Sequence, residues 1–278
     1  MVQGSTKFFP RRPRSIATVP PTPAPAPENP VDRLEVTHEG AHAIAERGDR
    51  GWEVTMSAGT GRLDVAAGTQ LLQDLSSVVA DHGGGPMRWR VAAATDEHDR
   101  IARNAGFGSD RHLVQLRRSL PVDASVRGDV TDVETRPFVP GRDDDEWLRV
   151  NNAAFAWHPE QSGWTSDHLA EPLAEPWFDP DGFLLHPATG PVQGFCWTKE
   201  HRDTSPPLGE IFIIAVDPEA AGQGLGRRLV LAGLDHLSQR GLGTAMLYTE
   251  ADNEPARRLY SQLGFEVHHT VTVYERSV

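Results

Sequence analysis

Residues 211–230 read IFIIAVDPEAAGQGLGRRLV, and this stretch decides how the chain folds. The run Ile211–Val216 is apolar and rich in β-branched residues, which predicts a strand buried on both faces. Asp217-Pro218 ends this strand, and three glycines follow within residues 221–226. Leucines and a valine then recur at helical spacing. The order strand, glycine-rich turn, helix indicates an α/β fold.

The glycine-rich turn has the properties of an anion-binding loop. Gly222, Gly224 and Gly226 let the backbone approach a ligand closely and adopt positive φ. The first amides of the following helix lack partners within it, and the helix dipole adds partial positive charge. Arg227 and Arg228 add formal charge. The turn is not a Walker loop or a dinucleotide-binding fingerprint, because the required lysine and third glycine spacing are missing. A turn whose glycines serve packing alone is the alternative.

The segment after this helix continues the α/β pattern. Residues 245–249 predict another strand, and Asn253 fits the N-cap of a short helix. Gly264 occupies the position just past that helix, where glycine is favoured. Residues 266–276 alternate and predict a terminal strand.

Together these motifs resemble the GNAT superfamily of N-acetyltransferases. Its acyl-CoA loop is written [QR]-x-x-G-x-[GA], and residues 221–226 match it except that Ala221 replaces Gln or Arg. The segment from Tyr260 to Phe265 resembles a second signature, Y-x-x-x-G-F, whose tyrosine faces the departing thiolate. The resemblance implies acetyl-CoA as co-substrate and a mixed central sheet flanked by helices. A tyrosine that only fills the core is the alternative.

The chain also resembles itself at one fixed offset. Residues 105–107 and 263–265 both contain Gly-Phe, and 263 − 105 = 158. The same offset aligns residues 87–91 with the strand predicted over 245–249. One gapless offset across some forty residues indicates two tandem copies of one α/β unit.

The two copies differ where the chemistry is expected. Residues 222–224 are Gly-Gln-Gly, whereas the first copy has Asp-Val-Ala over residues 64–66. Ala102 stands where the second copy has Tyr260. We therefore expect tandem GNAT units of which the N-terminal one is shortened, degenerate and unable to bind the cofactor, serving packing or substrate closure.

Composition restricts the class of protein. The 278 residues hold 27 Lys+Arg and 39 Asp+Glu, a net charge of −12, which argues against nucleic acid as a partner. No apolar run approaches the roughly 20 residues that span a bilayer. A single cysteine, Cys196, cannot form an intrachain disulfide or a cysteine-cluster metal site. We expect a cytoplasmic, monomeric protein with no metal and no membrane partner.

Interruptions of the apolar pattern divide the chain into four parts. Residues 1–30 are proline-rich, which predicts a disordered tail, or alternatively a start codon assigned too early. Residues 31–120 hold the degenerate N-terminal GNAT-like domain. Residues 121–134 are the expected linker, and residues 135–278 the catalytic GNAT domain.

A more specific resemblance runs through residues 130–278. The motifs NNAAFAxHPEQxGW, WFDPDG, WTK and GE[IV] occur in the order typical of the mycothiol synthase family. That resemblance implies acetyl transfer from acetyl-CoA to the cysteinyl amine of 1-D-myo-inositol 2-(L-cysteinylamino)-2-deoxy-α-D-glucopyranoside, giving mycothiol. Two alternatives are a GNAT enzyme for another small-molecule or peptide amine and a non-catalytic CoA-binding protein.

The family resemblance also implies contacts. Acceptor contacts fall on Glu160, Lys199, Glu210 and Tyr248. Acetyl-CoA contacts fall on Ile214, Ala215, Val216, Ala221, Gly222, Gln223, Gly224, Leu225, Gly226, Arg227, Asn253, Glu254, Pro255, Ala256, Arg257 and Arg258.

The chemistry of the residues suggests their roles. Glu210 precedes the loop and is our candidate base for the acceptor ammonium, and Tyr260 the candidate acid for the CoA thiolate. A backbone N–H near Ala215 or Val216 would hold the carbonyl oxygen. Trp197 would offer a flat face to the acceptor. For the acceptor residues, surface charge or a place in the core is the alternative.

Overall fold

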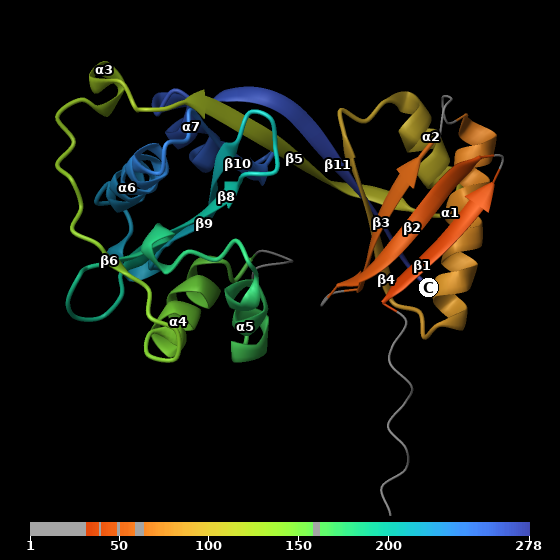
Figure 1. The fold of residues 1–278 in the computed structure, drawn as a ribbon, viewed down its shortest axis with the longest axis horizontal. Helices are drawn as coiled ribbons and strands as arrows, with labels where there is room; N and C mark the ends of the chain where they lie inside the picture. Colours follow the sequence, from red (N-terminus) through yellow and green to blue (C-terminus); the bar gives the residue numbers. More distant parts are fainter. Residues whose placement is uncertain (1–31, 39, 49–50, 59–63, 158–161) are drawn as a thin grey trace, which may run out of the picture. The chain divides into compact units, whose positions relative to one another are not determined.

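The computed structural model describes residues 32–38, 40–48, 51–58, 64–157 and 162–278, and it is drawn in Figure 1. Residues 32–278 form one compact unit. The tail predicted over residues 1–30 lies outside the described residues.

The first half of the chain alternates strands and helices. Its elements are β1 (Arg33–His38), β2 (Ala41–Gly48), β3 (Gly51–Ser57), α1 (Val65–Asp81), β4 (Pro86–Ala92), α2 (Asp96–Asn104) and β5 (Gly108–Ser119). The short helix α3 (Ala124–Arg127) follows in the predicted linker.

The second half adds a helical pair before the same series. Its elements are β6 (Arg136–Pro137), α4 (Asp144–Ala154), α5 (Ser166–Ala174), a 3-10 turn (Pro180–Gly182), β7 (Phe183–His186), β8 (Gly194–His201), β9 (Leu208–Val216), a second 3-10 turn (Pro218–Ala220), α6 (Leu225–Gln239), β10 (Thr244–Glu250), α7 (Glu254–Gln262) and β11 (Glu266–Ser277).

The predicted repeat is visible in these bounds. An offset of 158 converts the bounds of β4, α2 and β5 into those of β10, α7 and β11, as in 266 − 108 = 158. Among the described residues, the first half has no counterpart of α4 and α5. The GNAT prediction of a mixed sheet flanked by helices, with a shortened first unit, is confirmed.

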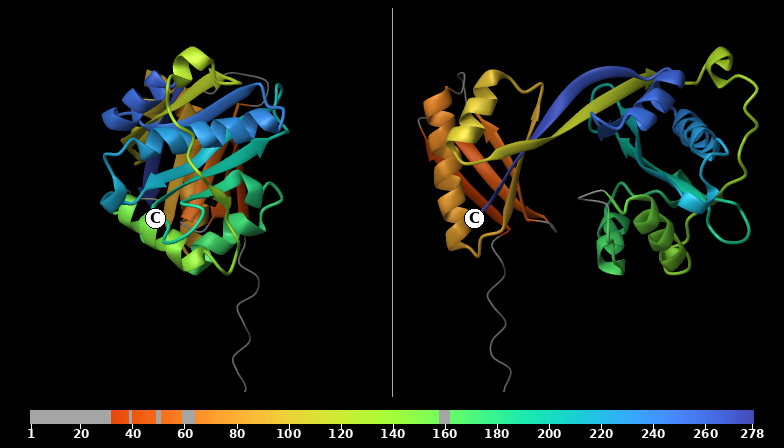
Figure 2. Two further views of the ribbon diagram at one scale, coloured as in Figure 1. Left: turned by 90° about the vertical axis from the view of Figure 1, so that its left-hand side faces the viewer. Right: turned by 180° about the vertical axis from the view of Figure 1, so that it is seen from behind.

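The two halves exchange their last strands. Among the described residues, the sheet order is β1-β2-β3-β4-β11-β5-β10-β9-β8-β7-β6. The last strand of the first half therefore pairs with β10 of the second, and the last strand of the second pairs with β4 of the first. Figures 1 and 2 show β5 and β11 running side by side, as their antiparallel pairing requires. The sheet is continuous from the first half to the second, so the strand order does not mark a domain boundary. The domain bounds therefore stay a prediction.

Equivalent arginines hold the exchanged strands. Arg118 of β5 donates to the carbonyl of Leu263, the C-cap of α7. Arg276 of β11 donates to the carbonyl of Ala105, the C-cap of α2, at 2.5 Å. Because unpaired carbonyls and the helix dipole favour a cation at a C-terminus, each contact fixes one strand to the other half.

Buried side chains lie on both faces of the second half's sheet. On one face α6 and α7 pack against β5, β9 and β10, and this cluster includes Leu229, Leu234 and Tyr260. On the other face α4 and α5 pack against β7, β8 and β9, in a cluster that includes Trp147 and Trp197. Most of the predicted site residues belong to β8, β9 and β10 and to the starts of α6 and α7.

Candidate active site

The glycine-rich loop leaves the start of α6 uncovered. Gly222 and Gly224 adopt φ of +83° and +70°, as predicted, whereas Gly226 lies within the helix. A Cβ at Gly222 or Gly224 would meet nothing within 4 Å. The helix has no side-chain cap and no acid in its first turn. Its first amides are therefore available to an anion.

The equivalent helix of the first half begins with a carboxylate cap. Asp64 caps α1, and its Oδ1 accepts from the amide of Ala67 at 2.8 Å. The offset from α1, which begins at Val65, predicts a start for α6 at residue 223, but the glycines delay it to Leu225. The first half thus carries a carboxylate where the second presents free amides.

The two arginines after the loop make their contacts elsewhere. Arg227 donates from Nη2 to the carbonyl of Val126 at 2.7 Å. Arg228 lines a cavity of about 280 Å³ together with Asp132 and Asp235. That both side chains add charge at the loop stays a prediction, whereas the uncapped amides at the start of α6 are a source of attraction for an anion in the loop itself.

Strands β9 and β10 separate beside this loop. They are parallel and pair only at Gly209–Ala245 and Glu210–Met246. On the other edge of β9, the pairing with β8 shifts register at Phe212, which lies in a β-bulge. Residues 211–216 therefore present backbone groups that β10 does not pair. The predicted contacts Ile214, Ala215 and Val216 lie on this segment.

Polar side chains follow one face of the sheet at the point of separation. Glu210 lies opposite Lys199 of β8 and Met246 of β10, and Met246 lies opposite Arg117 of β5. Paired residues of adjacent strands share a face. The predicted acceptor residues Lys199 and Glu210 are therefore neighbours.

Glu210 is held by a histidine that no sequence motif singled out. Glu210 is buried, with its side chain 11% exposed, and its Oε2 lies 2.7 Å from Nε2 of His201. His201 is two residues beyond Lys199 on β8, so strand alternation places both on this face. This two-residue spacing from Lys199 is the sequence signal that could have identified His201 as a neighbour of Glu210.

Neighbouring side chains hold both Lys199 and a third predicted acceptor residue, Tyr248, on the same face. The Lys199 ammonium is 4.2 Å from the centroid of the Trp177 ring and 5.5 Å from that of Phe212, a cation–π arrangement. The Tyr248 hydroxyl accepts from Nε2 of Gln115, at 2.5 Å. Trp177, Phe212 and Gln115 were also missed. Glu160 lies outside the described residues.

Tyr260 lies on the opposite side of the separated strands. It is buried among the side chains beneath α6 and α7, with Phe265 edge-on to its ring. Burial, with a contribution from Cys196, raises the pKa of Tyr260 far above its usual range. Among the described residues its hydroxyl has no hydrogen-bond partner. Burial likewise raises the pKa of Cys196 to about 12, so this thiol stays protonated and is a poor nucleophile at neutral pH.

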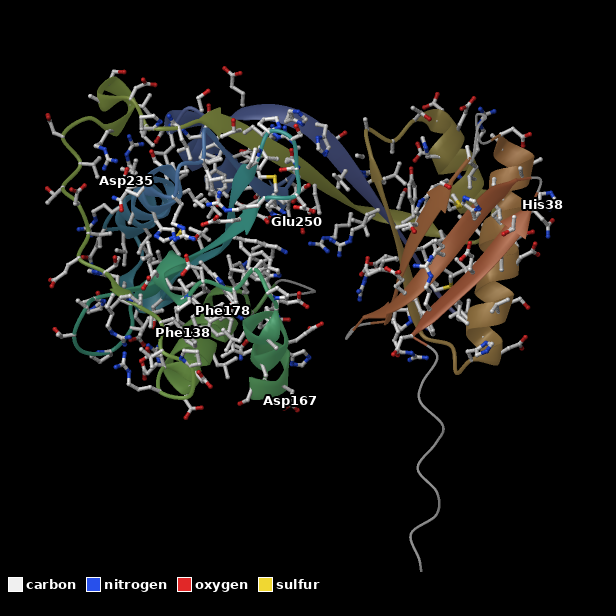
Figure 3. The ribbon with its side chains drawn as sticks, in the orientation of Figure 1. His38, Phe138, Asp167, Phe178, Asp235 and Glu250 are labelled. Carbon is white, nitrogen blue, oxygen red and sulfur yellow. The ribbon has the colours of Figure 1, made fainter. Side chains whose placement is uncertain are left out.

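The predicted role of Trp197 is wrong. Its side chain is 0% exposed, stacks on Phe183 at 4.2 Å between ring centroids, and has Phe178 edge-on, the residue labelled in Figure 3. Trp197 shares a strand face with Lys199, but it lies under α4 and α5, whereas Lys199 extends beyond them. It is a core residue and presents no surface to an acceptor.

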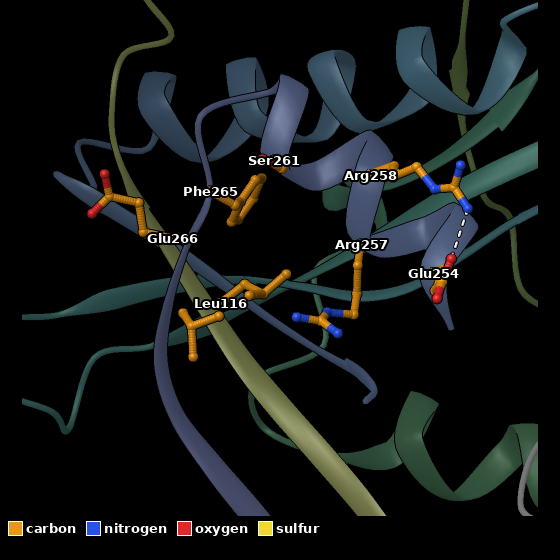
Figure 4. A pocket seen from close by; sticks show the side chains of 8 residues that line it. Leu116, Glu254, Arg257, Arg258, Ser261, Phe265 and Glu266 are labelled. Carbon is orange, nitrogen blue, oxygen red and sulfur yellow. Dashed lines mark hydrogen bonds and ion pairs between the residues drawn. The ribbon is translucent and has the colours of Figure 1, made fainter. Parts of the chain in front are cut away.

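The residues around the start of α7 form a separate part of the site. Asn253 caps the helix as predicted, accepting from the amide of Ala256 at 3.2 Å. Arg258 pairs with Glu254, and Arg257 donates to the carbonyl of Ala251 at 2.9 Å. A cavity of about 570 Å³ lies along α7, shown in Figure 4. Its lining residues are Leu116, Glu254, Arg257, Arg258, Ser261, Phe265, Glu266 and Val267.

One group of possible metal ligands exists among the described residues. Oxygen or nitrogen atoms of Asp179, Glu200 and His236 lie within 4.8 Å of one another. Arg240 and Arg202 both pair with Glu200, so cations of the protein itself already neutralise it. No described helix is long and apolar enough to cross a bilayer.

Comparisons with known proteins agree with this geometry. Residues 147–265 match the model of the acetyltransferase (GNAT) family. The chain is similar to the tandem GNAT protein of the clavulanic acid biosynthesis pathway (TM-score 0.60, 12% identity, 89% of this chain and 84% of that one). It is also similar to a GCN5-related N-acetyltransferase from Sphaerobacter thermophilus (TM-score 0.67, 21% identity, 86% and 76%). These likenesses show the tandem GNAT fold.

Two curated relatives show to which group of GNAT enzymes the chain is similar. The mycothiol acetyltransferase of Nocardia farcinica is 40% identical over 250 residues, covering 87% of this chain and 81% of the relative. That of Rhodococcus erythropolis is 39% identical over 277 residues, covering 88% and 91%. The match extends through the first half, where the sequence resemblance rested on the repeat. The chain therefore belongs to the mycothiol acetyltransferase family of GNAT enzymes.

Proposed function

We propose that the chain transfers the acetyl group of acetyl-CoA to the cysteinyl amine of 1-D-myo-inositol 2-(L-cysteinylamino)-2-deoxy-α-D-glucopyranoside, giving mycothiol. The observation that carries the proposal is the position of Glu210, a buried carboxylate at the last paired position of β9 and β10. Family membership supports the acetyl transfer and the small-molecule acceptor. We propose the cytoplasm as the compartment and a single chain as the working unit.

The loop and the separated strands suit acetyl-CoA. The positive φ values at Gly222 and Gly224 and the uncapped start of α6 fit a pyrophosphate. The unpaired edge over residues 211–216 can bond the amide groups of the pantetheine arm, as a strand edge bonds an added strand. This arrangement would place the thioester beside Glu210. In the cavity along α7, the charges of Arg257 and Arg258 are matched by those of Glu254 and Glu266, so the anion site depends on the backbone amides of the loop.

Glu210 acts as the base in this proposal. The Glu210 carboxylate takes one proton from the acceptor ammonium and passes it to solvent, and the amine nitrogen then attacks the thioester carbonyl carbon. The second proton, which this nitrogen must lose to become an amide, then goes to the same carboxylate. The Nε2–H of His201 occupies Oε2 of Glu210, so Oε1 is the oxygen left to receive the proton. The new carbon–nitrogen bond forms, and the carbon–sulfur bond to CoA breaks. A backbone N–H of the unpaired β9 segment holds the carbonyl oxygen.

Tyr260 acts as the acid. Its raised pKa keeps the hydroxyl protonated at neutral pH, and the hydroxyl has no partner among the described residues. It can therefore deliver its proton to the CoA thiolate and recover one from solvent. Glu210 and Tyr260 carry out the proton transfers, and the backbone N–H stabilises the oxyanion. The proposed chemistry therefore needs no metal ion.

A comparison of acceptors tests the proposal. The purified protein is incubated with acetyl-CoA and one amine at a time, and the acetylated product is measured by mass spectrometry. We expect kcat/KM for the cysteinyl glucosaminyl-inositol to exceed that for free cysteine and for the sugar without the cysteinyl group by at least about 100-fold, since each lost buried polar contact is worth several-fold or more. An equal or higher rate with an unrelated amine would overturn the proposed acceptor.

The cell offers a second test. In an organism that makes this protein, the low-molecular-weight thiols are compared with and without the gene. We expect the unacetylated cysteinyl compound to accumulate. Binding of acetyl-CoA without turnover on any amine would instead favour a CoA-binding protein.

A further inference from the structure

The first half contributes side chains to the acceptor face of the second. Gln115 and Arg117 belong to β5, the strand that the first half gives to the exchanged pairing. Gln115 lies opposite Tyr248 of β10, and Arg117 lies opposite Met246, next to Glu210. The acceptor face therefore draws on residues more than 100 positions apart in the sequence, as the Gln115–Tyr248 separation of 133 shows.

Three of these side chains form a directed chain of hydrogen bonds. Arg117 donates from Nε to Oε1 of Gln115 at 2.7 Å, and Gln115 donates from Nε2 to the Tyr248 hydroxyl at 2.5 Å. A guanidinium can only donate, so it fixes which end of the Gln115 amide faces it. The amide nitrogen must then face Tyr248. The direction of both hydrogen bonds follows from the arginine.

This direction sets the behaviour of the tyrosine hydroxyl. Because the Tyr248 oxygen already accepts from Gln115, its own hydrogen is free to be donated elsewhere. The Tyr248 side chain is 43% exposed, whereas Gln115 is only 3% exposed. The hydroxyl is thus held from within the protein and open to a ligand outside it.

We propose that Gln115 is a positioning residue that makes Tyr248 a hydrogen-bond donor to an oxygen atom of the acceptor. This inference rests on the proposed function and adds a contribution from the first half to substrate recognition. A hydroxyl, ether or carbonyl oxygen of the acceptor meets the donated hydrogen, whereas an ammonium group does not. Tyr248 therefore selects the oxygen-rich part of the acceptor and leaves the amine to Glu210.

Gln115→Glu tests the direction of the hydrogen bond. A carboxylate still satisfies Arg117 but can only accept, so the Tyr248 hydroxyl turns its hydrogen inward. We expect the Kd of the acceptor, measured by calorimetry with CoA present, and its KM to rise about three- to tenfold, the value of one lost hydrogen bond. Both kcat and the Kd of acetyl-CoA should change less than twofold.

Two further variants separate positioning from a purely structural role. In a Tyr248→Phe background, Gln115→Glu should weaken acceptor binding no further, because the hydroxyl that it misorients is gone. Gln115→Met, which neither donates nor accepts strongly, should fall between wild type and Gln115→Glu, because the hydroxyl is then free to rotate. Gln73→Leu is the control: Gln73 also makes one side-chain hydrogen bond in the first half, to the carbonyl of Asn104, and its loss should leave acceptor binding unchanged.

The possible outcomes distinguish this inference from the proposed function. If the wild-type protein does not bind the cysteinyl acceptor, the proposed function fails. If wild type binds it and Gln115→Glu binds equally well, only the positioning role fails. Additive losses in the double variant, or equal losses of acetyl-CoA affinity, would also overturn the positioning role. If Gln115→Glu does not fold, Gln115→Met in both tyrosine backgrounds distinguishes the same outcomes.

Discussion

The contrast between Gly222 and Asp64 leads to a prediction about the cofactor loop. The two residues occupy equivalent positions in the repeat, since 222 − 64 = 158. Asp64 caps α1 with its carboxylate, whereas Gly222 precedes an uncapped helix. Gly222→Asp therefore transfers the acid of the first half into the loop of the second. A side chain there meets no atom within 4 Å, so charge and backbone conformation are the relevant effects.

The expected magnitude follows from these two effects. A non-glycine residue at φ of +83° costs about 1 kcal/mol, and Asp and Asn tolerate this region better than other residues. A carboxylate about 5 Å from a pyrophosphate with two charges is repelled by about 2–3 kcal/mol in a solvent-exposed loop. We expect the charge alone to weaken acetyl-CoA binding about 20- to 200-fold.

Calorimetry with acetyl-CoA measures this effect against a matched control. Gly222→Asn has the same shape and the same backbone cost without the charge, so the ratio of the two Kd values isolates the repulsion. The ratio should shrink severalfold between 0.05 and 0.5 M salt, as screening increases (the Debye length falls to about 4 Å). Equal Kd values for the Asp and Asn variants would refute the assignment of this loop as the pyrophosphate site.

Three other variants test the base, the acid and a stabilising ion pair. Glu210→Gln should lower kcat about 10²- to 10⁴-fold at pH 7, while the Kd of acetyl-CoA stays unchanged; a loss below fivefold in a steady-state assay would remove it as the base. Tyr260→Phe should slow acetyl transfer about 100-fold, and because burial raises the pKa of Tyr260, wild type should show no loss of rate from this group up to pH 10. Burial opposes ionisation of Asp143, but hydrogen bonds from Arg136 and Arg142 outweigh it and hold its pKa well below the usual range. Because the pKa of Asp143 is lower in the folded chain than in the unfolded chain, where it is near 4, its charged form stabilises the fold above about pH 4. Asp143→Asn should therefore lower the free energy of unfolding, measured in urea at pH 7, by about 1–3 kcal/mol, and this loss should shrink below pH 4.

Local chemistry predicted the second half of the fold well. Asn253 and Gly264 mark the two ends of α7, because a side-chain cap and a positive φ are needed at those positions. Gly222 and Gly224 likewise marked the loop before α6. The offset of 158 then carried these bounds into the first half, where composition alone was less informative. Such signals are readable because each depends on a few neighbouring residues.

Neighbouring residues in the sequence do not show how deeply a side chain is buried or that the two halves exchange their last strands. Alternation assigns Trp197 and Lys199 to one face of β8, but only the packing of α4 and α5 decides that the first is buried and the second is not. The repeat aligned β5 with β11 but does not say which half each strand joins. Gln115 therefore had no visible connection to Tyr248, although the two side chains share a hydrogen bond.

The exchange explains how the first half can still serve the reaction. Asp64 caps α1 where the second half leaves its helix without a side-chain cap, and Ala102 stands where the second half has Tyr260. Its last strand nevertheless lies between β10 and β11, held by Arg118 at the end of α7. The proposed role of Gln115 would add acceptor recognition to the packing or substrate closure expected of the first half. A strand fixed at that position carries Gln115 to Tyr248, so selection for the proposed acceptor contact can act on the first half through that strand.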